Sequence, residues 1–161
     1  MSAENVAIVK SIYEAFARGD VAAVLGRMSS DVLWHEAENF PYADRNPYRG
    51  PEAVAAGVFA RCVGEWNGFA VKMDDLIDGG DRIVALGRYS GQNKATGRHM
   101  NPQAVHVWTV KAGKVVAFQQ YIDTLDVARA TGALCAAARR KILTAQKIMC
   151  FLYPAGGRVI A

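Results

Sequence analysis

Residues 103–122 read QAVHVWTVKAGKVVAFQQYI and contain two runs in which apolar and polar side chains alternate. A period of two is typical of strands, because successive side chains point to opposite faces of a sheet. A short turn, Lys111–Lys114 (KAGK), separates the two runs. Turns of this length join neighbouring antiparallel strands, so the stretch predicts a hairpin with strands over 103–110 and 115–122.

Two more runs with the same period come just before this hairpin. They lie near residues 69–77 and 82–91, with the glycine-rich turn Asp78–Asp81 (DGGD) between them. A further turn, Lys94–Gly97 (KATG), follows the second of these runs. Four closely spaced strands with short connections predict a largely antiparallel sheet.

The residues before this sheet have helical periodicity, apart from one segment. Apolar residues recur at helical spacing over Val6–Phe16, Val21–Met28 and Pro51–Trp66. Between the second and third of these stretches, Asp31–Glu36 (DVLWHE) alternates as a strand, and a long loop follows over 37–50. Because three helices come first and the run of strands comes later, the order predicts an α+β fold and not alternating βαβ units.

The chain of 161 residues is 52% hydrophobic, enough to bury the core of one domain. Its net charge of +4 is unevenly distributed. Residues 1–132 carry 14 Lys and Arg against 15 Asp and Glu, whereas residues 133–161 carry five Lys and Arg and no acidic residue. We therefore expect a slightly acidic domain over 1–132 and a basic C-terminal extension over 133–161, helical over 133–152 and irregular beyond. Since the basic charge belongs to the extension, no nucleic-acid partner is expected.

Some classes of protein and site are not expected from this sequence. No apolar run approaches the ~20 residues of a membrane span, and the N-terminus lacks the basic and apolar regions of a signal peptide. We therefore expect a cytoplasmic protein. The three cysteines, Cys62, Cys135 and Cys150, are too widely spaced for a disulfide framework or a zinc site. Reduced thiols are expected, and no cofactor.

Short motifs between residues 31 and 124 occur in an order that resembles a known family. They are Asp31–His35 (DVLWH), Tyr48–Gly50 (YRG), Asp81–Gly87 (DRIVALG), His106–Trp108 (HVW), Gly113–Val115 (GKV) and Tyr121–Thr124 (YIDT). Together with the helices before them, they resemble the SnoaL-like polyketide cyclases, which belong with ketosteroid isomerases in the NTF2-like superfamily. The resemblance implies a cone-shaped α+β barrel, in which a curved mixed or antiparallel sheet packs against three N-terminal helices. It also implies an apolar cavity on the concave face and a homodimer that packs through the sheet.

Strand alternation divides the polar residues of the expected sheet between two faces. Val32, Trp34 and Glu36 share one face of the first strand. Ala104, His106, Trp108 and Val110 group together on one later strand, and Val116, Phe118, Gln120 and Ile122 group together on the last strand. The resemblance to ketosteroid isomerases implies that these faces point inward.

By the same resemblance, Glu36 falls at the proton-abstracting aspartate of those isomerases. His106 falls at the protonated aspartate of their oxyanion hole, and Ile12 at its tyrosine. Only the base is conservatively replaced, which disfavours a steroid isomerase. Epoxide hydrolases of the superfamily are disfavoured as well, because Arg82 matches their arginine while Val84 and Gln120 replace their two aspartates.

The predicted site therefore has Glu36 and His106 as a catalytic acid/base pair in a hydrophobic cavity. Substrate-binding side chains are expected from Phe16, Trp34, Trp108, Phe118, Gln120 and Ile122, with His35, Tyr89 and Asp123 as weaker candidates. Other interpretations stay open. Glu36 could equally be an exposed carboxylate near Arg45 or Arg49. His106 could equally be a structural histidine of the core.

This site predicts an isomerase, cyclase or dehydratase that acts on a small hydrophobic, ketone-like molecule. A non-catalytic carrier of an apolar ligand is the first alternative. A protein-interaction module is the second, and it predicts an interior without a pocket. A metal site is not expected, because the adjacent residues His35 and Glu36 point to opposite faces of a strand.

Overall fold

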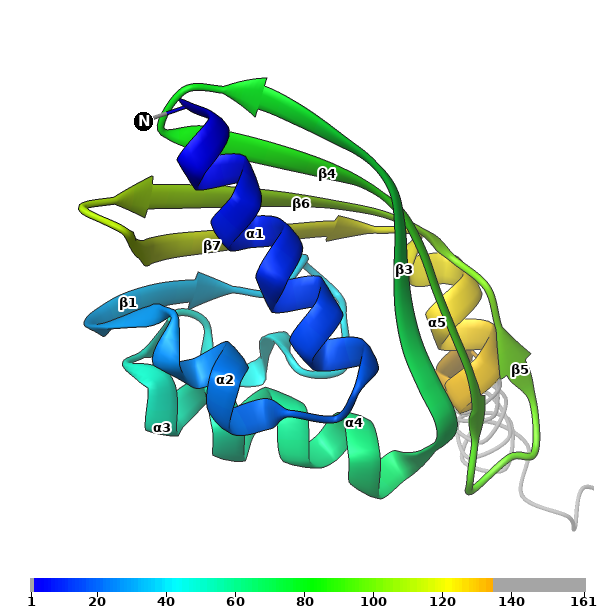
Figure 1. Ribbon diagram of the computed structural model, residues 1–161. Helices are drawn as coiled ribbons and strands as arrows, with labels where there is room; N and C mark the ends of the chain where they lie inside the picture. The colour runs from blue at the N-terminus through cyan, green and yellow to red at the C-terminus, as the bar shows by residue number, and fades with distance from the viewer. Residues whose placement is uncertain (1, 135–161) are drawn as a thin grey trace, which may run out of the picture.

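The structure of the protein, a computed structural model, describes residues 2–134 (Figure 1). The helices are α1 (Ser2–Ala17), α2 (Val21–Gly26), α3 (Pro51–Val54), α4 (Ala60–Glu65) and α5 (Thr124–Thr131), with a short 3-10 turn, η1 (Ala43–Arg45), and a π-helical segment, η2 (Ala55–Phe59). The strands are β1 (Met28–His35), β2 (Tyr48–Arg49), β3 (Trp66–Gly79), β4 (Arg82–Asn93), β5 (His99–Met100), β6 (Gln103–Lys111) and β7 (Lys114–Ile122). The α+β order expected from the sequence is confirmed.

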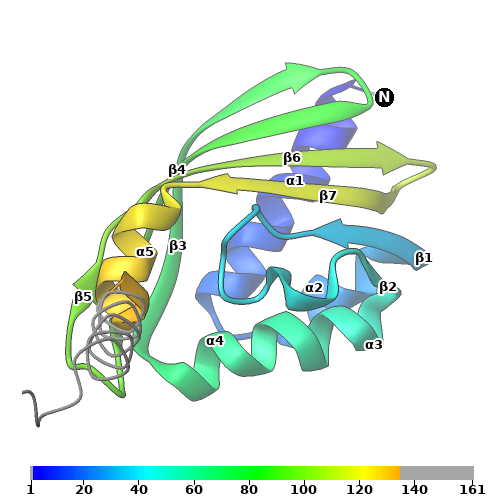
Figure 2. The ribbon, with the colours of Figure 1, turned by 180° about the vertical axis from the view of Figure 1, so that it is seen from behind.

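The strands form one mixed sheet that curves around the helices. Its order is β2-β1-β7-β6-β4-β3, and β5 pairs with the far end of β4. β1 runs parallel to β7, and the other neighbours are antiparallel. Figures 1 and 2 show α1 to α4 on the concave side of the sheet, while α5 packs against β4 and β5. The sheet is unclosed, so the helices supply the remaining wall of the interior.

Local sequence signals account for where the helices begin and end. Gly19 has φ +70°, and the Asp20 carboxylate then accepts a hydrogen bond of 3.0 Å from the Ala23 N–H, which starts α2. At the other end of the domain, Asp123 accepts from the first backbone N–H groups of α5, and Gly132 closes that helix with φ +76°. These caps fix where α2 and α5 begin and where α5 ends.

The predicted inward faces of β1 and β6 are confirmed, but on β7 the prediction is wrong for Val116, and Ile122 is only half-buried. Val115 is fully buried and Val116 is only half-buried, although alternation from Phe118 places Val116 inward. The cause is a register shift opposite Thr109 and Val110, where β7 has one extra residue. Beyond the shift, Phe118 and Gln120 point inward as expected.

The expected helix over 133–152 falls almost entirely outside the described residues, as do Cys135 and Cys150. Cys62 is a free, buried cysteine. Within residues 2–134, no helix has the length and apolar character that a membrane crossing requires.

Candidate functional site

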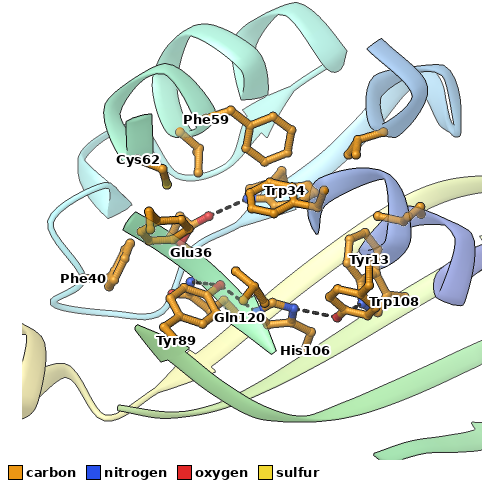
Figure 3. A pocket seen from close by; sticks show the side chains of 16 residues that line it. Tyr13, Trp34, Glu36, Phe40, Phe59, Cys62, Tyr89, His106, Trp108 and Gln120 are labelled. Atoms are coloured by element: carbon orange, nitrogen blue, oxygen red, sulfur yellow. Dashed lines mark hydrogen bonds between the residues drawn. The ribbon is translucent and has the colours of Figure 1, made fainter. Parts of the chain in front are cut away.

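A small cavity lies between the concave face of the sheet and the helices (Figure 3). Its volume is about 40 Å³, room for a few water molecules when each needs roughly 10–15 Å³. Aromatic and aliphatic side chains form most of its wall, among them Phe16, Trp34, Phe59 and Trp108. The polar side chains on this wall are few, so each of them has a large effect on what the cavity can bind.

Glu36 is the one acidic residue on the cavity wall. It directly follows β1 and is 2% exposed. Trp34 Nε1 donates a hydrogen bond of 2.6 Å to Oε1, whereas Oε2 is buried and has no partner within the described part of the chain. Burial raises the pKa of Glu36 from its ordinary value of 4.5 to about 7, and the side chains of Trp34 and Gln120 partly oppose that rise. The alternative interpretation, in which Glu36 is an exposed carboxylate near Arg45 or Arg49, is therefore wrong.

The backbone around Glu36 is held on both sides. The Glu36 N–H donates to Asn46 Oδ1 at 3.0 Å, and Asn46 Nδ2 donates back to the Glu36 carbonyl oxygen at 2.8 Å. The next N–H, of Ala37, donates to Gln120 Oε1 at 3.1 Å. These bonds replace the sheet pairing that β1 loses at its end, and they fix the direction of the Glu36 side chain.

His106 is the second polar centre of the cavity, and tyrosines occupy both of its ring nitrogens. Nδ1 lies 2.7 Å from the Tyr13 hydroxyl, and Nε2 lies 2.7 Å from the Tyr89 hydroxyl. Burial lowers the pKa of His106 from 6.5 to about 3, so the ring is neutral at physiological pH. The same burial raises the pKa of both tyrosines, so their hydroxyls stay protonated.

The two tyrosines are fixed in turn by donors from the sheet. Trp108 Nε1 donates to Tyr13 Oη at 2.7 Å, and Gln120 Nε2 donates to Tyr89 Oη at 2.9 Å. Gln120 therefore contacts both polar centres, because its Oε1 atom holds the chain beside Glu36. Residues from α1, β4, β6 and β7 meet in this one network.

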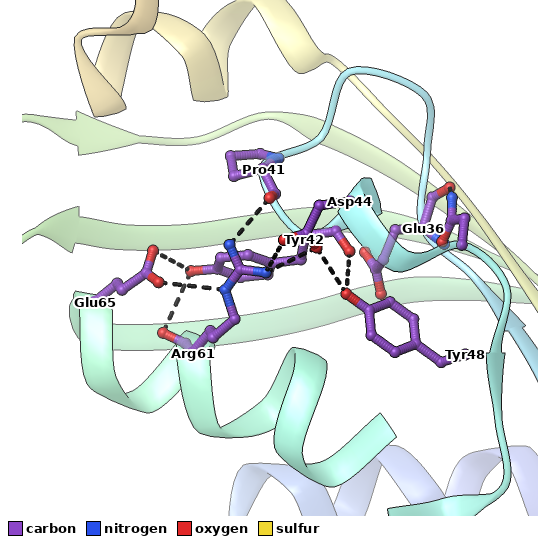
Figure 4. A network of polar contacts seen from close by, with 8 residues as sticks. Glu36, Pro41, Tyr42, Asp44, Tyr48, Arg61 and Glu65 are labelled. Carbon is purple, nitrogen blue, oxygen red and sulfur yellow. Dashed lines mark hydrogen bonds and ion pairs between the residues drawn. The ribbon is translucent and has the colours of Figure 1, made fainter. Parts of the chain in front are cut away.

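A separate polar network fixes the loop that follows Glu36 (Figure 4). Arg61 of α4 forms an ion pair of 2.9 Å with Asp44 and lies 4.3 Å over the Tyr42 ring. The Tyr42 hydroxyl donates to Glu65 at 3.1 Å and accepts from Trp66 Nε1 at 2.9 Å. The loop is thereby held against α4, and Phe40 at its start becomes part of the cavity wall.

The structure brings most of the predicted site residues together. Glu36, His106, Trp34, Trp108, Gln120, Phe16 and the weaker candidate Tyr89 all line the cavity. Phe118 is buried behind the wall, where its ring stacks on Trp34 with centroids 3.7 Å apart.

Three predicted residues lie elsewhere. His35 and Ile122 line an outer groove at the ends of β1 and β7, on the other side of Glu36 and Gln120. Asp123 caps α5 and is exposed, so its side chain does not enter the cavity.

Sequence reasoning missed Tyr13 and Asn46. Tyr13 follows Ile12, the residue that the resemblance places at the oxyanion-hole tyrosine, and it lies on the same helical stripe as Phe16. That stripe was a usable signal. Nothing in the sequence singles out Asn46, since its role depends on how the loop folds back on β1. Among the residues that the structure describes, no group of three or more His, Cys, Asp or Glu side chains is arranged to hold a metal ion.

Comparison with known proteins identifies the family. Residues 9–118 match the model of the SnoaL-like domain. An NTF2-like protein from Burkholderia thailandensis is 39% identical with a TM-score of 0.76, over 79% of this chain and 96% of that one. An NTF2-like protein of unknown function from Burkholderia pseudomallei is 30% identical with a TM-score of 0.72, over 79% and 96%.

More distant structures share the fold. A putative SnoaL-like polyketide cyclase from Jannaschia sp. is 17% identical with a TM-score of 0.69, over 80% of this chain and 92% of that one. No curated protein matches the chain. The family match over residues 9–118 and the closely similar structures establish that this chain belongs to the SnoaL-like family and has the NTF2-like fold.

Proposed function

We propose that this protein is an isomerase, cyclase or dehydratase that moves protons on a small hydrophobic, ketone-like substrate. The observation that carries the proposal is Glu36, a buried carboxyl with one oxygen unpartnered beside an apolar cavity. With a pKa of about 7, this carboxyl is partly ionised and partly protonated near neutral pH. A group that must both accept and return a proton needs both states.

The chemistry follows from the position of this carboxyl. Ionised Glu36 takes a proton from the carbon next to the substrate carbonyl; the C–H bond breaks, and its electron pair moves toward the carbonyl oxygen. The protonated carboxyl then returns its proton to another carbon in an isomerase, or to a leaving hydroxyl in a dehydratase. Positioned proton transfer of this kind contributes about 10²–10⁴-fold in rate.

The cavity favours a small and flat substrate. At about 40 Å³ it holds a few waters, and a ring-sized ligand has to displace those waters and move aromatic side chains of the wall. Phe40 and Phe59 belong to the loop and to the helical segment that cover the sheet. The substrate class is therefore a compact ketone without charged groups, because among the described residues the polar groups of the wall other than Glu36 are neutral.

Hydrogen exchange in D₂O tests the proposal without knowledge of the natural substrate. Purified protein is incubated with acetone, cyclopentanone and cyclohex-2-enone, and deuterium at the carbons next to the carbonyl is followed by ¹H NMR. We expect catalysed exchange of at least one ketone by the wild type and by the control Glu38→Gln, and none by Glu36→Gln. If Glu36→Gln exchanges as fast as the wild type, the assignment of the base is wrong.

A non-catalytic ligand carrier is the second candidate, and a specific observation favours it. Apart from Glu36 Oε2, the polar groups of the cavity described above bond to one another, as in a binding site that only orients its ligand. Native mass spectrometry of the protein as purified distinguishes the two functions. A retained apolar molecule that is released unchanged supports the carrier. An interaction module predicts an interior without a pocket, and the cavity argues against it.

The proposal includes a homodimer that packs through the convex face of the sheet. On β6 and β7, Val105 and Val107 are half-buried, and Tyr121 is 58% exposed. Sedimentation velocity tests this: we expect a dimer for the wild type and a monomer for Tyr121→Lys. The cytoplasmic location stays a prediction.

A further inference from the structure

A hydrogen-bonded chain runs from Tyr13 through His106 to Tyr89. Its hydroxyl and ring N–H groups carry one proton more than the two hydrogen bonds within the chain need. A neutral histidine has one ring nitrogen that donates and one that accepts. The contacts from Nδ1 to Tyr13 Oη and from Nε2 to Tyr89 Oη are both 2.7 Å long, and each uses one proton. The two hydroxyls and the ring N–H supply three protons, so one hydroxyl proton is left over.

The groups at the two ends of this chain cannot take up that proton. Trp108 Nε1 donates to Tyr13 Oη, and an indole nitrogen accepts no hydrogen bond. Gln120 Nε2 donates to Tyr89 Oη, and its amide cannot turn around because its Oε1 atom accepts from the Ala37 N–H. Within residues 2–134, the two hydroxyls have no further hydrogen-bond partner.

Both hydroxyl-bearing side chains line the cavity, as the view in Figure 3 shows. A buried O–H without an acceptor is unfavourable, and the unfilled space beside it is where an acceptor can enter. We propose that the cavity binds its ligand through a single acceptor oxygen, which takes a hydrogen bond from whichever of Tyr13 and Tyr89 carries the spare proton. This inference rests on the proposed function for the ligand class, a ketone whose oxygen gains negative charge as Glu36 removes a proton.

The tautomer of His106 decides which tyrosine is the donor. With the proton on Nε2, the ring donates to Tyr89 and accepts from Tyr13, so the Tyr89 proton is free for the ligand. With the proton on Nδ1, the directions reverse and the Tyr13 proton is free. His106 is thus a positioning residue, because its two nitrogens are occupied and it acts on the ligand only through the tyrosines.

Ring ¹⁵N NMR of histidine-labelled protein tests the inference, since protonated and unprotonated ring nitrogens resonate far apart. The probes are acetone and 2-methylpropene, which are both planar and of nearly equal size, but only acetone has an oxygen. His35→Asn and His99→Asn assign the three histidine signals. We expect acetone to move the two His106 signals in opposite directions, as one tautomer grows, and 2-methylpropene to leave the balance of tautomers unchanged.

Removal of either hydroxyl sharpens the test. In acetone-bound Tyr13→Phe the donor must be Tyr89, so the proton should lie on Nε2, and in acetone-bound Tyr89→Phe it should lie on Nδ1. The inference is overturned if acetone and 2-methylpropene give the same His106 spectrum in the wild type, or if both ring nitrogens carry protons in the free protein.

The same samples separate this inference from the proposed function. Exchange of the acetone hydrogens in D₂O reports on Glu36 and does not depend on the tautomer signal. A change in the His106 tautomer without exchange of the acetone hydrogens supports the hydrogen-bonded chain of Tyr13, His106 and Tyr89 as the donor, and argues against catalysis by Glu36. Exchange of the acetone hydrogens without a change in the His106 tautomer overturns the inference that this chain donates to the ligand, and it supports the proposed function.

Discussion

Replacement of Glu36 by glutamine should make the protein more stable at alkaline pH while it removes the proposed activity. Glutamine has nearly the same shape and can still accept the hydrogen bond that Trp34 Nε1 donates at 2.6 Å. It cannot ionise. The variant therefore isolates the cost of keeping a charged carboxylate inside an apolar cavity, where Oε2 has no partner in the described chain.

The magnitude follows from the two pKa values. The pKa of Glu36 is about 7 in the folded protein against an ordinary value of 4.5, and each tenfold change in proton affinity is worth about 1.36 kcal/mol. Between these values the folded state binds more protons than the unfolded state, so stability falls as the pH rises. The whole contribution is about 3 kcal/mol, present in full below pH 4.5 and lost above pH 7.

Urea unfolding followed by tryptophan fluorescence, at intervals from pH 4.5 to 8.5, measures this difference. We expect the free energy of unfolding of Glu36→Gln to exceed that of the wild type by an amount that grows with pH, to about 3 kcal/mol at pH 8. The fall in stability that Glu36 causes in the wild type should be absent from the variant. The control Glu38→Gln removes an exposed carboxylate two residues away and should run parallel to the wild type. A difference between Glu36→Gln and the wild type that stays constant with pH would refute the reasoning.

Three further variants test other parts of the account. Trp34→Phe removes the hydrogen bond that lowers the pKa of Glu36, so the pH midpoint of the Glu36 titration, followed by ¹³C NMR of the carboxyl group, should rise above that of the wild type; an unchanged midpoint contradicts the assigned contact. Gly87→Ala places a methyl group against the Lys72 carbonyl of the neighbouring strand and should cost at least ~1–3 kcal/mol in urea unfolding, whereas Gly64→Ala meets nothing and should not destabilise. Asp123→Ala removes the cap of α5 and should cost about 1 kcal/mol by the same measurement; no loss would mean that the cap contributes nothing.

The regular elements of this fold could be predicted because their signals are local. Alternation over 103–122 identifies a hairpin, and Gly19 with Asp20 marks the boundary between two helices. The bulge in β7 could not be predicted in this way, because it depends on how Val115 pairs with Val110 across the hairpin. A one-residue change of register moves a side chain to the other face, so even a correct strand assignment can mistake which valine is buried.

The site was most predictable where strand alternation governs it, whereas from α1 only Phe16 was identified and from the loop after β1 no residue was. Glu36, His106 and Gln120 share the cavity as alternation indicates. The partners that determine their behaviour come from elsewhere: Tyr13 from α1 and Asn46 from the loop after β1. Their contacts span 93 and 10 residues of sequence; the helical stripe places Tyr13 beside Phe16, but no local pattern shows that Tyr13 meets His106 or that Asn46 meets Glu36.

The most direct test of the central claim is a ¹³C NMR titration of the Glu36 carboxyl in the intact protein, with Glu36→Gln to assign its signal. The account predicts that this carboxyl titrates with a midpoint near pH 7, so that it can both accept and return a proton under neutral conditions. A midpoint near 4.5 would mean that the carboxylate is solvated or paired in solution. That result would contradict the buried acid/base site on which the proposed function depends.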